Sequence, residues 1–375
     1  MKKGFIYTDA YLDYDYGPNH PLKIIRLRLT YELIKAYGLL DLPFAQSILT
    51  RKAEEEDLAS FHSRDYLHIL KGASEAPLAG NAYSYGLGPG DNPIFPGLYD
   101  WSLLVTGATL QAADYVAKEE GETAFNIAGG LHHAMKSKAS GFCYINDPVI
   151  GILRLVNRGK RVAYVDIDAH HGDGVQAAFY RTNKVLTISL HETGYTLFPG
   201  TGFEYEVGEG EGEGYSVNLP FPPYTDDQTY VWAFEEIVPP LLHAFRPDVV
   251  VSQLGVDSFH NDPLTNLQLT MHGFEKVVRR IKELAPHWVA LGGGGYDVSN
   301  VARAWTLAWA VMSGVELNEE LPKSYIDKAA SVGIHDKELR GKEKLSSSSD
   351  SDDIRAETER VVNYLKKTVF PKVGA

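Results

Sequence analysis

Residues 161–174, RVAYVDIDAHHGDG, form the segment that decides the fold. Its first half is almost continuously apolar, which is typical of a strand buried on both faces in a parallel sheet. Aspartates, histidines and glycines follow directly where that strand ends. Open α/β sheets bind their ligands beyond the carboxyl ends of the strands. The segment therefore predicts a buried strand with a functional site at its end.

Further apolar runs of the same kind occur at residues 123–127, 184–190, 248–254 and 287–291. Helical patterns lie between the runs, most clearly at residues 101–118, 149–157, 227–245 and 270–284. This alternation predicts an α/β fold with a central parallel β-sheet flanked by helices. The runs end in AGGLHHA, DIDAHHGDG, QLGVDS and GGGGYD, which carry most of the unusual residues of the chain. A functional centre is therefore expected where these ends meet.

The composition of the chain excludes several classes of protein. The 375 residues carry a formal net charge of -13, which disfavours direct binding of nucleic acid and favours cationic partners. Cys143 is the single cysteine, so no intrachain disulfide is possible and a cytoplasmic location is expected. No apolar run approaches the roughly 18 residues of a membrane helix, and the N-terminus lacks the apolar core of a signal peptide. We expect a soluble protein without a membrane partner.

The hydrophobic pattern and the composition divide the chain into two regions. Residues 1–315 are predicted to form the catalytic domain, and residues 316–375 a C-terminal tail. Within the tail, SSSSDSDD at 346–353 is typical of a flexible spacer, and residues 354–369 are compatible with a terminal helix.

Three residues at the predicted strand ends suit a divalent metal ion. Alternate residues of a strand point the same way, so Asp166 and Asp168 share a face, and His170 follows two residues later. An aspartate and a histidine at this spacing also occur in ordinary turns, but Asp257 at another strand end adds a third ligand. Catalytic zinc takes three protein ligands and keeps one position open. We predict that Asp168, His170 and Asp257 bind Zn²⁺, although Fe²⁺ suits the same donors.

The remaining polar residues at the strand ends suggest proton transfer. His132 and His133 are adjacent in a loop of small residues, and Asp166 and Asp173 are left over from the metal set. A carboxylate that accepts from an imidazole N–H fixes the tautomer and raises the basicity of the ring, so two His–Asp dyads are predicted. The glycines at 292–295 lack nucleotide-loop spacing. They instead deliver Tyr296, whose hydroxyl is able to donate to a developing oxyanion.

These stretches together resemble the zinc-dependent histone deacetylase family, in particular its class I branch and the prokaryotic acetoin-utilisation proteins. The resemblance covers residues 14–313 in collinear order. It is carried by GPNHPLKIIRLRLT from 17, FHSRDYL from 61, GDNPIF from 90, FNIAGGLHHAMKSKASGFCYIND from 125, VDIDAHHGDGVQAAFY from 165, ISLHE from 188, FPGTG from 198, QLGVDS from 253 and LGGGGYDVSNVARAWT from 291.

The resemblance implies a single-domain, arginase-like fold with one catalytic zinc ion. It assigns the ligands, the two dyads (His132 with Asp166, His133 with Asp173) and the carbonyl-polarising tyrosine to the residues named above. It further implies an acyl-lysine tunnel at Gly141, Phe142, Phe198 and Leu264, a rim aspartate at Asp91, and an acetate-exit cavity at Arg26. K⁺ or Na⁺ would bind at two sites, one formed by Asp166, Asp168, His170, Ser189 and Leu190, the other by Phe179, Thr182, Val185 and Tyr215.

Three departures from the family pattern bear on substrate and regulation. Pro263 and Ser299 replace the basic residues of members regulated by inositol phosphates, so no such ligand is expected despite Lys23. Residues 261–263 offer no glutamate of the kind found in acetylpolyamine deacetylases, which favours peptidyl substrates. The loop GEGEGEGY at 208–215 carries three glutamates, which predicts either a solvated acidic turn or an acidic mouth that attracts positively charged peptides.

The function expected from these features is hydrolysis of the acetyl amide of acetyl-lysine in proteins, with release of acetate and free lysine. One alternative is a deacylase of small acetylated amines such as polyamines. Another is an acyl-lysine binding module without catalysis, against which the complete set of catalytic residues argues. The sequence leaves open the physiological substrate, whether a histone-like protein, an acyl-CoA synthetase or another protein, and it leaves open the oligomeric state.

Overall fold

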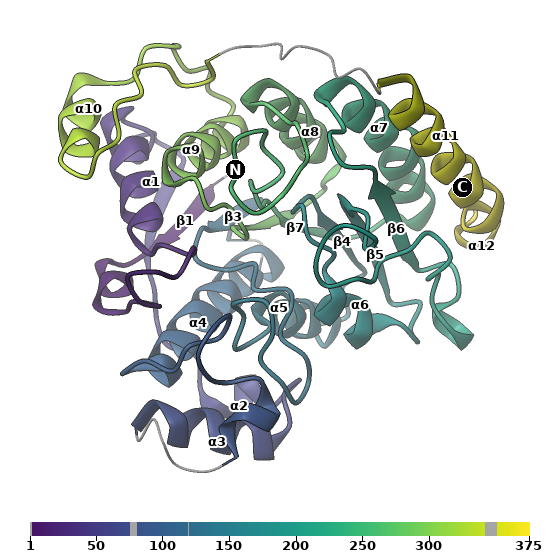
Figure 1. Ribbon diagram of the computed structural model, residues 1–375, viewed down its shortest axis with the longest axis horizontal. Coiled ribbons are helices and arrows are strands. Elements are labelled where there is room, and N and C mark those ends of the chain that lie inside the picture. The colour runs from purple at the N-terminus through teal and green to yellow at the C-terminus, as the bar shows by residue number, and fades with distance from the viewer. Residues whose placement is uncertain (1, 76–80, 119, 342–350) are drawn as a thin grey trace.

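A computed structural model describes residues 2–75, 81–118, 120–341 and 351–375. A sheet of eight parallel strands crosses the molecule in the order β2-β1-β3-β8-β7-β4-β5-β6 (Figure 1). The strands are β1 (Lys3–Tyr7), β2 (Ala45–Leu49), β3 (Thr123–Asn126), β4 (Val162–Asp166), β5 (Val185–Glu192), β6 (Ser216–Phe221), β7 (Val249–Gln253) and β8 (Trp288–Leu291). The predicted α/β fold with a central parallel sheet is confirmed.

Helices cover both faces of this sheet (Figure 1). One face carries α4 (Leu98–Ala117), α5 (Asp147–Val156) and α6 (Asp173–Phe179). The other carries α1 (Ile25–Ala36), α7 (Asp227–Phe245), α8 (Met271–Leu284) and α9 (Val298–Ser313). Helices α2 (Glu55–Leu58) and α3 (Arg64–Glu75) lie beyond α4.

Capping residues start several of these helices close to the carboxyl ends of the strands. Asn146 accepts a hydrogen bond from Val149 N–H at the start of α5, and Asp297 accepts one from Asn300 N–H at the start of α9. Thr270 caps α8 in the same way. Such caps satisfy backbone N–H groups that have no partner within the helix. They fix where each loop ends, and these loops carry the polar residues of the predicted site.

The region after α9 packs on the body of the molecule. Helix α10 (Lys323–Ala330) buries Tyr325 against Leu29 and Leu33 of α1. Helix α11 (Ser351–Thr368), followed by α12 (Phe370–Val373), lies against α7 and β6 and buries Val362 and Leu365.

The predicted terminal helix, residues 354–369, overlaps α11, which ends at Thr368, whereas the boundary at residue 315 stays a prediction. Most of the predicted spacer, residues 346–350, lies outside the described residues. Within the described ranges, no helix combines the length and the apolar character needed to cross a membrane.

Candidate active site

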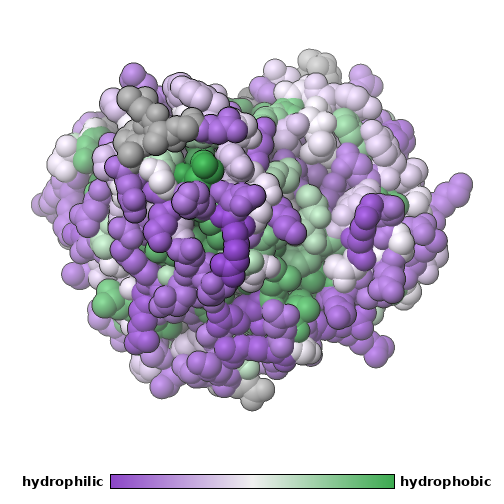
Figure 2. All heavy atoms as spheres, turned by 90° about the horizontal axis from the view of Figure 1, so that it is seen from below, coloured by the Kyte–Doolittle hydropathy of each residue, from purple (hydrophilic) through white to green (hydrophobic). Residues whose placement is uncertain are grey.

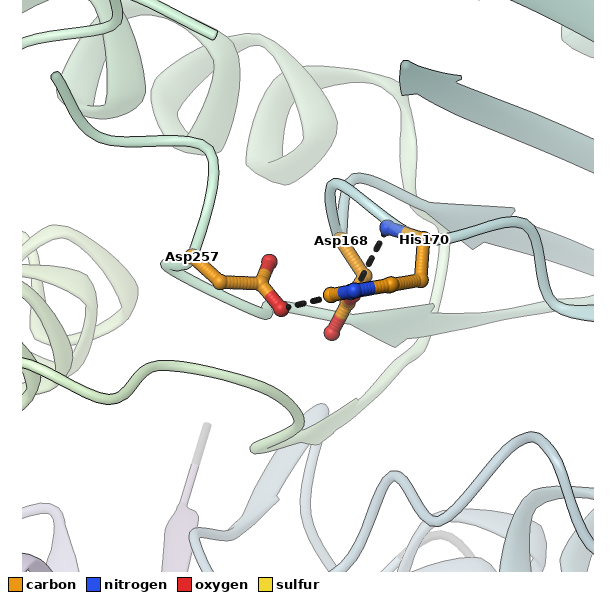
Figure 3. A group of neighbouring side chains, drawn as sticks. All are labelled: Asp168, His170 and Asp257. Atoms are coloured by element: carbon orange, nitrogen blue, oxygen red, sulfur yellow. Dashed lines mark hydrogen bonds and ion pairs between the residues drawn. The ribbon is translucent and has the colours of Figure 1, made fainter. Parts of the chain in front are cut away.

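Three side chains that are able to ligate a metal ion meet where β4 and β7 end (Figure 3). These strands are neighbours in the sheet, which brings Asp168 and His170 beside Asp257. The His170 Nδ1 atom lies 2.9 Å from Asp257 Oδ2 and 3.2 Å from Asp168 Oδ1. One ligand atom of each residue lies within 4.8 Å of the others, and all three residues are buried. Figure 3 shows Asp168 and His170 on one loop facing Asp257 on another.

The chemistry of these side chains fits a divalent cation. Burial lowers the pKa of the His170 imidazole, but Asp257 and Asp168 outweigh that effect and raise it to about 10. The site therefore attracts positive charge, because two carboxylates in a buried place need a cation nearby. Two carboxylates and one imidazole are also a donor set that zinc uses when it keeps one position open.

Neighbouring groups orient the two carboxylates. Gln253 Nε2 and Gly294 N–H donate to Asp168 Oδ2 at 2.6 and 2.7 Å. Ala169 N–H donates to Asp257 Oδ1 at 2.8 Å. Such outer partners hold ligands in the geometry that a metal requires. Sequence reasoning missed Gln253, although a glutamine that ends the apolar run VVVSQ was an available signal.

The structure brings the predicted His–Asp pairs together beside this triad. His132 Nδ1 lies 2.7 Å from Asp166 Oδ2, and His133 Nδ1 lies 2.8 Å from Asp173 Oδ1. The two Nε2 atoms are 3.0 Å apart. Burial lowers the pKa of His132, but Asp166 and Asp168 outweigh it and raise the pKa to about 9.

The pKa of the second histidine, His133, shifts in the opposite direction. Burial, followed by the charge on His132, lowers the pKa of His133 to about 4. At neutral pH the pair therefore holds one charged ring, His132, and one neutral ring, His133. A neutral imidazole is able to accept a proton.

A polar pair at the start of α5 holds the loop that carries both histidines. Asn146 Nδ2 donates to the carbonyl oxygens of His132 and Ala134, each at 2.9 Å. Asp147 accepts from Leu131 N–H at 2.9 Å and from Gly130 N–H. Sequence reasoning missed both residues. Their signal was the presence of an asparagine and an aspartate inside the otherwise apolar stretch CYINDPVI.

The glycine-rich loop after β8 places Tyr296 at the same centre. A Cβ atom on Gly294 would lie 2.1 Å from Asp257 Oδ2, and Gly293 and Gly295 have φ values of 138° and 133°. Only glycine allows this backbone to pass so close to the ligands. Burial, followed by Asp257 and Asp168, raises the pKa of the Tyr296 hydroxyl well above its usual value. The hydroxyl therefore stays protonated and remains a donor.

Aromatic rings line an approach from the surface to these groups. The Phe198 ring lies 5.0 Å from the His133 ring, and the Phe142 ring lies 5.6 Å from the Tyr296 ring, both edge to face. A Cβ atom on Gly141 would lie 2.5 Å from His133 Cδ2. Phe198 and Leu264 are partly exposed. Phe198 thus packs beside His133 and Phe142 beside Tyr296, whereas a tunnel that includes Leu264 stays a prediction.

Two further predicted residues lie on either side of this approach. Asp91 is exposed, and its carbonyl oxygen is 3.2 Å from Nε2 of His20, whose ring packs on Phe142. Arg26 is buried in α1 and donates to the carbonyl oxygen of Gly295 at 3.0 Å. A small cavity at the centre of the site is lined by residues that include His132, His133, Phe142, Asp168 and Tyr296; Arg26 is not among its lining residues, and an acetate-exit role for Arg26 stays a prediction.

The residues of the two predicted monovalent-cation sites lie on and beside β5. Ser189 pairs with Asp166 in the register of β4 and β5, and Leu190 follows it. In the second set, Thr182 N–H donates to the carbonyl oxygen of Phe179, and Thr187 N–H donates to that of Tyr215. Val185 begins β5. Binding of K⁺ or Na⁺ at either place stays a prediction.

The acidic loop at 208–215, predicted to be a solvated turn or an acidic mouth, forms ion pairs with basic residues. Glu209 pairs with Arg181 at 2.8 Å, and Glu213 pairs with Lys372 of α12 at 3.1 Å. Two of the three glutamate charges are therefore neutralised locally. The loop contributes less negative potential than its sequence indicates.

Comparisons with known proteins agree with this geometry. The histone deacetylase domain family matches residues 20–312. The acetoin utilization protein AcuC of Bacillus subtilis is 41% identical over 333 residues, covering 86% of this chain and 85% of the relative. Histone deacetylase 1 of Homo sapiens is 41% identical over 317 residues, covering 83% of this chain and 64% of that protein.

Solved structures show the same likeness in three dimensions. A crystal structure of an HDAC homolog from Aquifex aeolicus has a TM-score of 0.87 and 37% identity, covering 96% of this chain and 100% of that one. An HDAC homolog complexed with SAHA has a TM-score of 0.89 and 37% identity, covering 98% and 100%. With its buried aspartates and histidines gathered at the strand ends of this same fold, the chain belongs to the histone deacetylase family.

Proposed function

We propose that this protein hydrolyses the acetyl amide of acetyl-lysine in proteins and releases acetate and free lysine. The observation that carries the proposal is the convergence of the triad Asp168, His170 and Asp257 with neutral His133 and protonated Tyr296. A base, an oxyanion donor and a metal site at one point are the parts needed for metal-assisted amide hydrolysis.

Each catalytic residue has a distinct task in this proposal. Zn²⁺ bound by the triad would lower the pKa of a water molecule and polarise the acetyl carbonyl. His133 takes a proton from the water as its oxygen forms a bond to the carbonyl carbon. The Tyr296 hydroxyl donates to the oxyanion that develops. When the carbon–nitrogen bond breaks, His133 returns a proton to the departing lysine amine, while charged His132, held by Asp166, stabilises the negative charge electrostatically.

The approach to the site suits a long apolar stem. Phe142 and Phe198 would enclose the methylene groups of the acyl-lysine, and Gly141 would leave room between them. Asp91 would hold the substrate backbone at the rim, and Arg26 would line the route by which acetate leaves. The absence of a glutamate at residues 261–263 supports peptides over polyamines as substrates.

The same proposal covers the cofactors and location of the protein. Zn²⁺ is the metal we propose, Fe²⁺ being chemically compatible with the same donors. K⁺ or Na⁺ would have a structural role at the sites beside β5. We further propose that the protein acts in the cytoplasm, without inositol phosphate.

The test is metal-dependent release of acetate. Purified protein is stripped with a chelator, reloaded with Zn²⁺, and assayed on an acetyl-lysine peptide and on N-acetylated polyamines, with His133→Ala as the inactive control. We expect release from the peptide only after reloading. A preference for polyamines would assign the small-amine function instead. Binding of the peptide without any release of acetate would identify a non-catalytic module.

A further inference from the structure

Asp262 is a buried carboxylate that none of the roles above uses. It lies five residues after the ligand Asp257, in the loop between β7 and α8, and is 7% exposed. Its Oδ2 accepts from Tyr296 N–H at 2.8 Å, and its Oδ1 accepts from Leu264 N–H at 3.0 Å. Burying a carboxylate is costly unless hydrogen bonds compensate for it. Both compensating bonds go to backbone groups of residues in the site.

The loop that carries Tyr296 needs a hydrogen bond from outside to fix its path. Tyr296 follows four glycines, which have no side chains to fix the path of the loop. A second set of contacts strengthens the same connection, because Asn261 Nδ2 donates to Asp297 Oδ2 at 3.3 Å. Asn300 Nδ2 also donates to Asn261 Oδ1 at 2.6 Å. Residues 261–264 therefore hold the loop that presents the tyrosine.

We infer that Asp262 is a positioning residue that fixes the Tyr296 main chain and joins the oxyanion donor to the tunnel wall at Leu264. One carboxylate thus sets the distance between the group that polarises the carbonyl and the side chain that lines the entrance. The inference deepens the proposed function and rests on it, since Tyr296 matters in this way only if its hydroxyl acts on a bound acyl group. Asp262 itself does not touch the substrate.

The variant Asp262→Asn tests this inference with little change in volume. Asparagine keeps one acceptor oxygen and turns its NH₂ group toward the second backbone N–H, so one of the two bonds is lost. A displacement of the donor by about 1 Å lowers turnover by up to roughly 100-fold, so we expect a fall in kcat that approaches this size. Zinc content, measured by elemental analysis, is expected to stay at the wild-type value.

A double-mutant cycle separates positioning from general damage. Tyr296→Phe alone should lose roughly 10²–10³ in kcat, the usual scale for one oxyanion donor. If Asp262 acts through the tyrosine hydroxyl, adding Asp262→Asn to Tyr296→Phe should cause little further loss. The matched control is Asp227→Asn. Asp227 also accepts a backbone N–H, from Thr270 at 2.8 Å, but at the α7–α8 contact, so its loss should lower Tm and leave kcat unchanged.

Three outcomes would overturn the inference. The first is a kcat of Asp262→Asn equal to that of the wild type. The second is a fall in kcat on this substitution that is as large in the Tyr296→Phe background as in the wild-type background. In both cases an active wild-type enzyme leaves the proposed function intact. A wild-type protein that releases no acetate from any acetylated substrate after zinc loading would refute the proposed function itself, and the positioning role with it.

Discussion

Gly141 shows how closely a single residue limits the space between His133 and Phe198. Its φ of 52° lies in the left-handed region, and a Cβ atom there would lie 2.5 Å from His133 Cδ2 and 2.9 Å from Phe198 Cε1. The missing side chain leaves a gap between the rings of His133 and Phe198. A methyl group would reach both rings at once, so this position combines a backbone requirement with a steric one.

We therefore expect Gly141→Ala to lower kcat/KM for an acetyl-lysine peptide by about 100-fold, because the base and the wall are both displaced by the order of 1 Å. Zinc content should be unchanged. Gly38→Ala is the matched control: Gly38 has a φ of 69° but open space around its Cβ position. Its backbone strain alone should lower stability without loss of activity. Equal activity losses in the two variants would show that the Gly141 contacts are irrelevant.

Asp257 is the residue on which the metal assignment depends most directly. Asp257→Ala leaves only Asp168 and His170, which is too few ligands to hold a catalytic ion tightly. We expect zinc to fall far below one equivalent and acetate release to disappear, while circular dichroism remains that of a folded protein. Asp173→Asn is the comparison, since it should lose activity but keep its zinc. Full zinc occupancy in Asp257→Ala would refute the ligand assignment.

At the level of elements, the sequence predicted those strands that are buried on both faces and are therefore continuously apolar. It identified β3, β4, β5, β7 and β8, which lie inside the sheet. It missed the edge strand β2, whose pattern AQSIL is largely exposed, and the edge strand β6, which contains Pro220. It also missed β1, whose five residues begin with Lys3 and Gly4.

The candidate site, like the sheet, was predictable from the sequence only in part. Residues with distinctive chemistry, such as His132 and Asp257, stand out in the sequence. Asn146, Gln253 and Asp262 do not, because their hydrogen-bond partners in the site lie elsewhere in the sequence. For Asp262 and Tyr296 the separation is 34 residues. Only the folded arrangement of the loops shows which group each of these side chains contacts.

Helix α11 contributes stability to the sheet from outside the catalytic loops. Leu365 is fully buried in the contact of α11 with α7 and β6. We expect Leu365→Ala to lower the free energy of unfolding by about 2–5 kcal/mol, the usual cost of truncating a buried leucine. The kcat value should stay near that of wild type. Urea unfolding measures the first effect, and exposed Lys367→Ala serves as the control. A loss of kcat without a loss of stability would contradict this role.

For the whole molecule, charge is the property most relevant to substrate choice. Figure 2 shows a face dominated by hydrophilic residues, with hydrophobic ones gathered near its middle. The net charge of -13 remains even though Glu209 and Glu213 are paired. Exposed Asp91 adds negative charge at the proposed rim. Acetyl-lysine itself is neutral, so attraction must act on the residues that flank it.

We expect acetylated peptides with basic flanks to have a higher kcat/KM than matched peptides with acidic flanks. The difference should be modest and should shrink as salt is added, because exposed charges are screened over about 8 Å at physiological ionic strength. Assays of the two peptides at low and high salt measure the effect, and a peptide with uncharged flanks is the control. Equal rates at low salt would show that surface charge has no part in selection.

The position of β1 limits how the protein can be shortened for production. This strand lies between β2 and β3, yet its residues Lys3–Tyr7 precede the region that matches the family, which begins at residue 20. A chain trimmed to the matched region would lose an interior strand, detach β2 and uncover β6 by removing α11. Unpaired strand edges readily associate with other chains. Recombinant versions should therefore keep both ends, and a version cut at residues 20 and 312 is expected to aggregate.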